Sequence, residues 1–286
     1  MILLRDIWLA TVCLWMTFSV LATTVSAAET TISKAVKQPN GLLVHSVKSP
    51  YQAGKTSVSV LLPDQHDEKS KRKYRVLYVL PVERQDNKAW GDSVKEVLKT
   101  NLHNKYNLIC VFPAFSHLPW YADHPTNPLI RQETYFVKTV VPFIDRTYPV
   151  VKKRSGRLLV GFSKSGWGAF TLLLRHPRLF ERAAAWDAPL MEAEPKKYGM
   201  GPIFGDQKNF EKYHIRKLLQ RRAKDLSKKT RLIHLGYDNF RKHHVDAEKL
   251  MKELGIKQKY KDGPRRRHHW NTGWLLDAVA MLLEQG

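Results

Sequence analysis

The spacing of hydrophobic positions changes along the chain near residue 80. Leu42 to Val47 and Thr56 to Leu62 alternate or run apolar, and Pro63-Asp64 closes the second segment, which predicts a hairpin of antiparallel edge strands. Tyr74 to Leu80 is too continuously apolar for an exposed strand and predicts a central one. Beyond it, apolar strand-like runs alternate with segments of helical spacing.

The second part of the chain has the rhythm of a parallel sheet. The expected strands are Leu108 to Phe112, Arg157 to Gly161, Arg182 to Trp186, Arg231 to Leu235 and Lys257 to Tyr260. The expected helices are Asp92 to Asn104, Arg131 to Tyr148, Trp167 to Arg175, Phe210 to Asp225, Ala247 to Leu254 and Gly273 to Leu283. This alternation predicts an α/β fold with a mostly parallel central sheet and helices on both faces. No linker or repeat divides it, so one domain is expected over residues 29–286.

Residues 1–28 have the layout of a secretory signal peptide. Arg5 precedes an apolar run from Ile7 to Val20, and small residues lead to Ala27 and Ala28. The run is shorter than the about 20 apolar residues of a membrane-spanning helix. We therefore expect cleavage after Ala27 or Ala28, export to a periplasm or out of the cell, and no transmembrane segment in the mature protein.

The formal charge of +22 is large for a chain of 286 residues. The Lys and Arg residues concentrate in Lys69 to Arg75, Lys152 to Arg157, Lys212 to Arg231 and Lys257 to Arg267. No nucleic-acid-binding motif and no base-stacking pattern of aromatic residues accompanies them, which argues against a nucleic-acid partner. Two interpretations stay open: a partner that is an anionic surface or polyanionic glycan, or a basic face that is merely solvated.

The stretch Gly161 to Ala169 is the one most typical of catalysis. It has the pattern of a strand, a tight turn and a helix, with Ser163 at the tip, and such a turn exposes a serine hydroxyl while the following N–H groups face a developing oxyanion. A side chain at Gly161 would collide with the turn. Ser165 stands where the G-x-S-x-G pattern has its second glycine. The alternative is an ordinary glycine-containing turn, because short motifs occur by chance.

A serine nucleophile requires an acid and a histidine, which in this architecture follow at later strand ends. Asp238 follows the strand that ends at Leu235, and His268 lies in a basic loop before the last helix. Asp246 is a second carboxylate that could serve as the acid, and the strand-end position favours Asp238.

The other histidines and the cysteines do not predict a metal site. His243 and His244, early in a helix or its lead-in, are expected on the surface. There is no H-E-x-x-H motif and no zinc-binding Cys/His spacing, so we expect neither a metal nor another cofactor. Cys13 would be lost with the signal peptide, and Cys110 is expected to be a buried thiol without a disulfide.

With these motifs the chain resembles the esterase family of α/β-hydrolases that includes esterase D, feruloyl esterases and the antigen 85 mycolyltransferases. The resemblance extends from Ser49 to Trp274 and is most specific at the Gly161 to Ala169 elbow and the His268-x-Trp270 motif. That motif selects His268 over His269 as the base. The implied catalytic residues are Ser163 as nucleophile, Asp238 as acid and His268 as base.

The resemblance also implies residues that contact the substrate. Trp120 and Tyr121 resemble the family's aromatic loop that lines the acyl or alcohol site. Arg84, Trp167 and Trp270 are expected to contact the substrate as well.

The loop after the central strand departs from the family pattern. The family has His-Gly or Asp-Gly there, whereas this chain has Pro81-Val82-Glu83-Arg84. The oxyanion would be held by the Lys164 N–H and by the N–H of Glu83 or Val82. The Glu83 carboxylate would oppose the growing negative charge unless it points away or pairs with Arg84 or Lys164. The departure implies either a substrate whose acidic group Lys164 and Arg84 bind, or weak activity.

Two classes of function therefore stay open. The elbow, acid and histidine in order favour an exported serine esterase that hydrolyses a carbohydrate-linked or small acyl ester through an acyl-enzyme. The loop after the central strand, which departs from the family pattern, together with Ser165 and the charge, favours a weakly active or inactive relative that binds an anionic glycan or envelope surface. Acyl transfer to a sugar and hydrolysis are not distinguished by the sequence.

Overall fold

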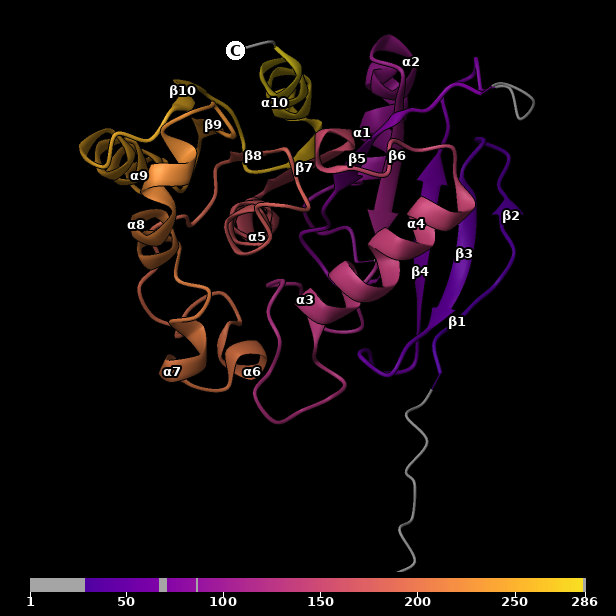
Figure 1. Ribbon diagram of the computed structural model, residues 1–286, viewed down its shortest axis with the longest axis horizontal. Coiled ribbons are helices and arrows are strands. Elements are labelled where there is room, and N and C mark those ends of the chain that lie inside the picture. The colour runs from indigo at the N-terminus through magenta and orange to yellow at the C-terminus, as the bar shows by residue number, and fades with distance from the viewer. Residues whose placement is uncertain (1–28, 67–70, 86, 285–286) are drawn as a thin grey trace, which may run out of the picture.

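The computed structural model describes residues 29–66, 71–85 and 87–284. The expected signal peptide with Cys13, and Lys69 of the first basic segment, lie outside the described residues. In the described part, ten strands form one sheet in the order β1-β3-β4-β6-β5-β7-β8-β9-β10, with β2 paired to β3 (Figure 1). The strands are β1 (Thr31–Ile32), β2 (Val36–Lys37), β3 (Leu43–Lys48), β4 (Lys55–Leu61), β5 (Arg75–Val79), β6 (Leu108–Pro113), β7 (Arg157–Phe162), β8 (Arg182–Trp186), β9 (Leu232–Tyr237) and β10 (Gln258–Arg265).

The pairing confirms the expected kind of sheet. Strands β5 to β10 pair in parallel, and β1 to β4 pair antiparallel at the N-terminal edge, where β4 joins β6. The helices are α1 (Ser93–Thr100), α2 (Leu102–Lys105), α3 (Gln132–Tyr135), α4 (Val141–Thr147), α5 (Ser163–Arg175), α6 (Gly201–Phe204), α7 (Gln207–Phe210), α8 (Ile215–Leu226), α9 (Arg241–Glu253) and α10 (Trp274–Leu283). Short turns of other helical types are η1 (Phe136–Val140), η2 (Arg154–Gly156) and η3 (Trp270–Thr272).

The core has two layers, one on each face of the sheet. Because side chains alternate along a strand, Val76 and Tyr78 of β5 join one cluster while Leu77 and Val79 join the other. Helices α4, α5, α8 and α9 contribute to the first cluster, and α1, α2 and α10 to the second. Figure 1 shows these two helical groups around the sheet, as the alternating pattern predicted.

Several expected helices differ in their bounds from the sequence pattern: α9 begins at Arg241 rather than Ala247, α8 begins at Ile215 rather than Phe210, and the helix expected over 92–104 is divided into α1 and α2. The helix expected at Trp167 begins at Ser163, directly at the end of β7, so no loop separates strand from helix. The helix expected over 131–148 contains the π-helical turn η1, followed by Pro142 at the start of α4. Pro142 has no N–H to donate to the preceding turn, which explains a break in regular α-helical bonding there.

The strand order creates a crevice at the carboxyl ends of the central strands. Strand β5 lies between β6 and β7, so the connections from these strands leave in opposite directions, and ligands of such sheets bind at this point. The loops after β5, β8 and β9, and the turn from β7 into α5, all open at this edge. Among the described helices, none is long and apolar enough to cross a membrane.

Candidate active site

Ser163 occupies the strained turn between β7 and α5. Its φ is +52°, a left-handed conformation that is uncommon for a residue with a side chain, and it is 6% exposed. A Cβ atom on Gly161 would lie 2.4 Å from the main-chain oxygen of Ser165, so the collision expected at this position is confirmed. The geometry is that of a nucleophile elbow.

Ser165 bonds to the main chain of the same turn. Its buried hydroxyl accepts a hydrogen bond from the Phe162 N–H (3.1 Å) and donates one to the Phe162 carbonyl (2.9 Å). The serine that replaces the second glycine of the motif therefore satisfies both main-chain groups of the residue before Ser163. This departure from the pattern stabilises the turn.

The carboxylate that contacts His268 is Asp187 rather than Asp238. His268 Nδ1 lies 2.5 Å from Asp187 Oδ2, and the two residues are 8% and 1% exposed. Asp238 instead accepts the main-chain N–H of His268 (3.2 Å) and pairs with Arg265 Nε (2.8 Å). The assignment of Asp238 as the acid is therefore wrong. The physical reason is that β8 and β9 are neighbours whose ends open into the same crevice, so either loop can supply the carboxylate.

The second candidate acid, Asp246, is also excluded from the contact with the histidine. It lies on α9 and pairs with Lys242 four residues earlier, 2.8 Å away.

Asp187 is held in an ionised and fixed state. Burial opposes its ionisation, but hydrogen bonds from His268 and from main-chain N–H groups outweigh burial and lower the pKa of Asp187. The donating N–H groups belong to Asn239 (3.0 Å) and Phe240 (2.7 Å). An ionised carboxylate at Nδ1 selects the tautomer of His268 that leaves Nε2 free to accept a proton.

Ser163 and His268 line one small cavity of about 170 Å³. Its other lining residues are Trp90, Lys164, Pro189, Tyr198, Asn239 and Phe240. Within the described chain Ser163 Oγ makes no hydrogen bond, so the hydroxyl is available to a ligand. The rings of Phe162 (5.0 Å between centroids), Trp90 (5.1 Å) and Phe240 (5.7 Å) surround His268 and limit access of water to it.

Of the candidate oxyanion donors, Lys164 lines this cavity, whereas Val82 and Glu83 line a neighbouring one that shares Trp90 with it. Lys164 is in the first turn of α5, where N–H groups have no partner inside the helix. Across the crevice, the main-chain N–H groups of Val82 and Glu83 donate no hydrogen bond to any described residue. The available N–H groups therefore include all three that the sequence suggested.

The Glu83 carboxylate forms an ion pair with Lys164, one of the two partners that the sequence suggested for it. Its Oε1 lies 2.7 Å from Lys164 Nζ and accepts a hydrogen bond from Trp90 Nε1 at 3.2 Å. Both side chains of the ion pair are mostly buried, at 13% and 12% exposure. The pair joins the loop after β5 to the first turn of α5 and counters the negative charge of Glu83.

The aromatic residues expected at the substrate are mostly structural, so that prediction is corrected. Trp120, Tyr121 and Trp167 are fully buried, and the rings of Trp120 and Trp167 pack edge to face at 5.5 Å. Tyr121 donates a hydrogen bond to the Pro81 carbonyl (2.6 Å) and so supports the loop after β5 from behind. Their bulk fills the core beneath the elbow instead of facing a ligand.

The other two expected substrate contacts lie at the edge of the site. Arg84 is exposed on the loop after β5 and lines neither cavity. Trp270 is 2% exposed, and its accessible edge lines a second cavity rather than the one at Ser163.

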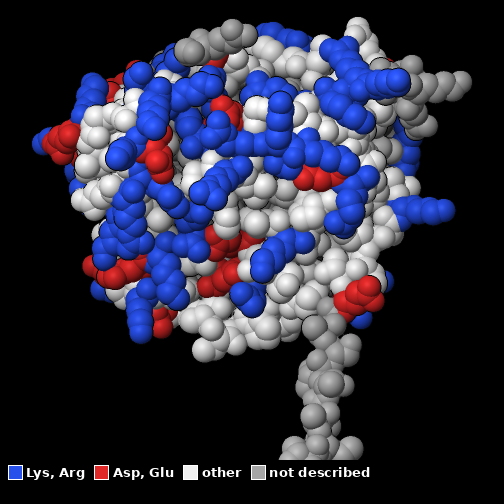
Figure 2. Space-filling view, viewed as in Figure 1, with Lys and Arg blue, Asp and Glu red and all other residues white. Residues whose placement is uncertain are grey.

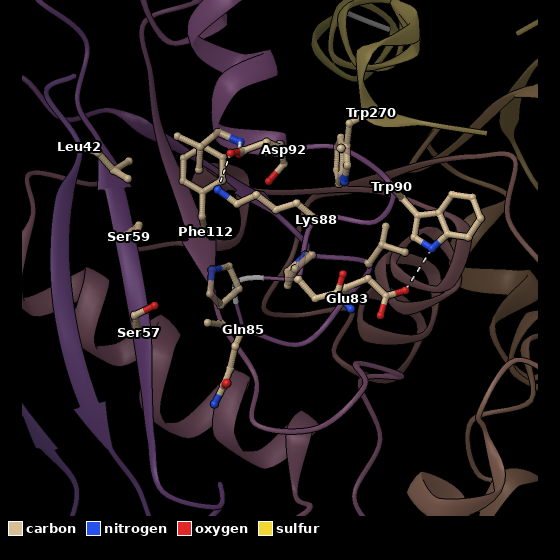
Figure 3. Close-up of a pocket in the computed structure, with 18 of the residues that line it drawn as sticks. Leu42, Ser57, Ser59, Glu83, Gln85, Lys88, Trp90, Asp92, Phe112 and Trp270 are labelled. Carbon is tan, nitrogen blue, oxygen red and sulfur yellow. Dashed lines mark hydrogen bonds and ion pairs between the residues drawn. The ribbon is translucent and has the colours of Figure 1, made fainter. Parts of the chain in front are cut away.

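This second cavity, of about 260 Å³, lies between β4 and the loop after β5 (Figure 3). Trp90 lines both cavities, and Glu83 forms part of the wall of the second cavity. Figure 3 shows Ser57 and Ser59 facing the space from β4. Within the described chain neither of these side-chain hydroxyls has a hydrogen-bond partner. Polar groups and aromatic edges therefore adjoin the cavity at Ser163.

Sequence reasoning missed several residues of the site. Asp187 carried a usable signal, because it directly follows the apolar strand Arg182–Trp186, as Asp238 follows β9. Trp90, Tyr198 and Phe240 carried none, since they reach the cavity through loops whose course depends on the whole fold.

No metal site is present among the described residues, where no three His, Cys, Asp or Glu side chains gather suitably. Cys110 is a free buried thiol, as predicted, and burial raises its pKa to about 12. The chemistry proposed below uses neither a metal ion nor the Cys110 thiol.

Comparison with known proteins bears on the fold and the family. A ferulic acid esterase of known structure superposes with a TM-score of 0.67 at 23% identity, covering 84% of this chain and 95% of that one. FphF, a fluorophosphonate-binding serine hydrolase of Staphylococcus aureus, superposes with a TM-score of 0.69 at 15% identity, covering 85% and 98%. These likenesses show the α/β-hydrolase fold.

Sequence comparisons give the family. Esterase Rv1288 of Mycobacterium tuberculosis is 26% identical over 142 residues, which is 46% of this chain and 29% of that protein. The chain thus spans less than a third of the curated relatives it matches. The family model "Putative esterase" matches residues 49–277, which include Ser163, Asp187 and His268. The chain therefore belongs to the esterase family of α/β-hydrolases.

Proposed function

We propose that the protein is a serine esterase that hydrolyses carboxylic esters through Ser163, His268 and Asp187. The observation that carries the proposal is the arrangement of His268, which contacts Asp187 through Nδ1 and lines the same cavity as the unbonded Ser163 hydroxyl. A serine elbow, an oriented histidine and a buried ionised carboxylate together support nucleophilic catalysis.

The reaction follows from these positions. His268 Nε2 takes the Ser163 proton as Oγ bonds to the ester carbonyl carbon, and the carbonyl oxygen becomes an oxyanion bound by the Lys164 N–H and by the Val82 or Glu83 N–H. The oxyanion collapses, the alcohol leaves with the proton from His268, and an acyl-serine remains. Water, deprotonated by His268, then releases the acid and restores Ser163.

The two cavities support different roles for the two parts of the ester. The cavity at Ser163 is small and partly apolar, which suits a short acyl group. The second cavity offers the free hydroxyls of Ser57 and Ser59 together with Trp90 and Trp270, a combination that suits a hydroxyl-rich alcohol such as a sugar. A carbohydrate-linked or small acyl ester is the proposed substrate. A sugar hydroxyl in place of water would give acyl transfer.

We also propose that the protein is exported, as its N-terminal sequence pattern supports, and that it meets an anionic surface or glycan, as its charge supports. Lys and Arg side chains cover much of the face seen in Figure 2, including the side on which α8 and α9 lie. Arg216, Arg221 and Lys224 of α8 are exposed. Retention on heparin up to high ionic strength is expected, and elution at low salt would contradict this part of the proposal.

Covalent labelling with a fluorophosphonate tests the proposed chemistry, because the probe reports only whether a serine is activated. Residues 29–286 should be labelled, and Ser163→Ala and His268→Ala should lose the label. Ser227→Ala, at the C-terminal end of α8 and outside the lining of both cavities, is the serine control and should label normally. A folded wild-type protein that does not react would favour the inactive, glycan-binding relative.

A further inference from the structure

Two buried histidines, His244 of α9 and His234 of β9, lie directly behind the loop that carries Asp187. Both are 0% exposed, although the sequence placed His244 on the surface, so that expectation is corrected. Their rings stack at 5.4 Å, and the Tyr260 ring stacks on His234 at 4.4 Å. Neither histidine lines the cavity at Ser163, so the proposed reaction does not use them directly.

The hydrogen bonds of the two histidines determine which ring nitrogen of each carries the proton. The Ala188 N–H donates to His244 Nε2 (2.8 Å), so this nitrogen carries no proton. The His244 proton is then on Nδ1, which lies 3.2 Å from His234 Nδ1 and donates to it. The His234 proton is in turn on Nε2, which makes no hydrogen bond within the described chain and lies 3.7 Å from Glu248 Oε2. Both rings are therefore neutral, each in a defined tautomer.

Burial agrees with this assignment. It lowers the pKa of His244 well below the ordinary value, and the nearby His234 and His243 lower it further while Asp187 opposes them. Burial also lowers the pKa of His234, with Glu248 and Gln258 opposing. Tyr260 is the other titratable group that stacks on the pair.

Asp187, the residue before the Ala188 N–H that His244 binds, has a backbone conformation that needs support. Asp187 has a φ of +37°, a left-handed conformation that a non-glycine residue holds only where its surroundings impose it. Asn239 and Phe240 fix its carboxylate from one side. His244 fixes the peptide that follows it, because the bonded N–H belongs to Ala188, the next residue.

We propose that His244 is a positioning residue for the Asp187 carboxylate: its unprotonated Nε2 holds the Ala188 peptide, and His234 holds the required tautomer by accepting the His244 Nδ1 proton. The proposal rests on the proposed function only for its kinetic consequence. The arrangement itself concerns the native protein whether or not it is active.

The test compares two substitutions at His244 with one at its neighbour. His244→Gln places an amide oxygen near the Nε2 position and can still accept the Ala188 N–H, whereas His244→Phe keeps a ring and loses the acceptor. His243→Ala is the matched control, because His243 Nδ1 accepts the Met191 N–H (3.1 Å) farther along the same loop.

We expect His244→Phe to lower kcat for a p-nitrophenyl ester about 10- to 100-fold with KM nearly unchanged, since a small misplacement of a catalytic group has this effect. Fluorophosphonate labelling of Ser163 should slow in parallel. His244→Gln should recover most of the rate, and His243→Ala should stay close to wild type. A folded His244→Phe enzyme with wild-type kcat, or a Gln variant as slow as the Phe variant, would overturn the proposal.

A measurement on the unmodified protein covers the case in which His244→Phe does not fold. Nitrogen NMR of ¹⁵N-histidine-labelled protein at neutral pH should show a buried histidine with the proton on Nδ1, absent in His244→Gln. A charged ring or a proton on Nε2 would overturn the proposal. Failure of the wild type to label with fluorophosphonate would instead refute the proposed function, and the NMR result would still decide the role of His244 in holding Ala188.

Discussion

At the scale of single residues, the departure of Ser165 from the motif stabilises the turn that carries Ser163. Its hydroxyl satisfies the N–H and the carbonyl of Phe162, both buried. Ser165→Ala leaves these groups without that partner, so we expect the free energy of unfolding to fall by about 1–3 kcal/mol. Denaturant unfolding measures the change. Thr171→Val, which removes another buried hydroxyl of α5, should cost less, because Thr171 bonds only to the Gly168 carbonyl; equal stability of Ser165→Ala and wild type would contradict the account.

The same scale shows how far sequence alone can reach into the site. Ser163 and His268 are marked by short local motifs, and both were predicted and are brought together at one cavity. The choice between Asp187 and Asp238 depends on which loop turns toward His268, which no local pattern records. The burial of His244 likewise depends on α9 packing against β9 and the Asp187 loop.

At the scale of elements, the ion pair between Lys164 and Glu83 joins α5 to the loop after β5. Lys164→Met would leave the Glu83 carboxylate without its cation beside the proposed oxyanion donors. We expect kcat to fall about 10- to 100-fold, and stability to fall by less than the about 3–5 kcal/mol of a fully buried pair, because both groups are slightly exposed.

The double variant Glu83→Gln with Lys164→Met is the control for this prediction, since it removes the unpaired charge as well. It should recover part of the lost kcat, and the four proteins together form a double-mutant cycle. Equal activity of Lys164→Met and wild type would mean that the ion pair has no part in shaping the oxyanion site.

The elements themselves were largely predictable, because strands buried on both faces give continuous apolar runs and helices give periodic ones. The boundaries were less so. Gly166 and Gly168 lower helix propensity near the start of α5, so the sequence pattern predicted a later start than Ser163. Packing requires the glycine at 168, because a Cβ there would lie 2.0 Å from the Tyr121 ring. The short helices α6 and α7 have too few residues to show a period.

At the scale of the whole molecule, the buried histidines predict the response of stability to acid. Burial lowers the pKa of His103, His117, His214, His234, His243 and His244. Between the lowered folded pKa and about 6.5, the unfolded chain binds more protons than the native one, so stability falls as pH drops through this window. The carboxylates Asp187 and Glu133, whose pKa values are lowered, lose their contribution only at more acidic pH.

Urea unfolding between pH 7.5 and 5 measures this effect. The fully buried His234 and His244 can each contribute up to about 1.4 kcal/mol per pH unit below pH 6.5. His244→Gln should show a shallower fall than wild type, because an amide does not titrate. A wild-type stability that stays constant down to pH 5 would contradict the assignment of neutral buried histidines.

The central claim is that Ser163 is activated by a histidine that Asp187 orients. Comparing kcat for Asp187→Asn and Asp238→Asn with a p-nitrophenyl ester tests it most directly, since both changes remove one charge at neighbouring strand ends and keep the shape of the side chain. Asp187→Asn should lower kcat about 10³- to 10⁴-fold, because the amide no longer orients the reactive tautomer of His268. Asp238→Asn can still accept the His268 main-chain N–H and should lower kcat less than about tenfold. A large loss in Asp238→Asn with near wild-type activity in Asp187→Asn would contradict the account.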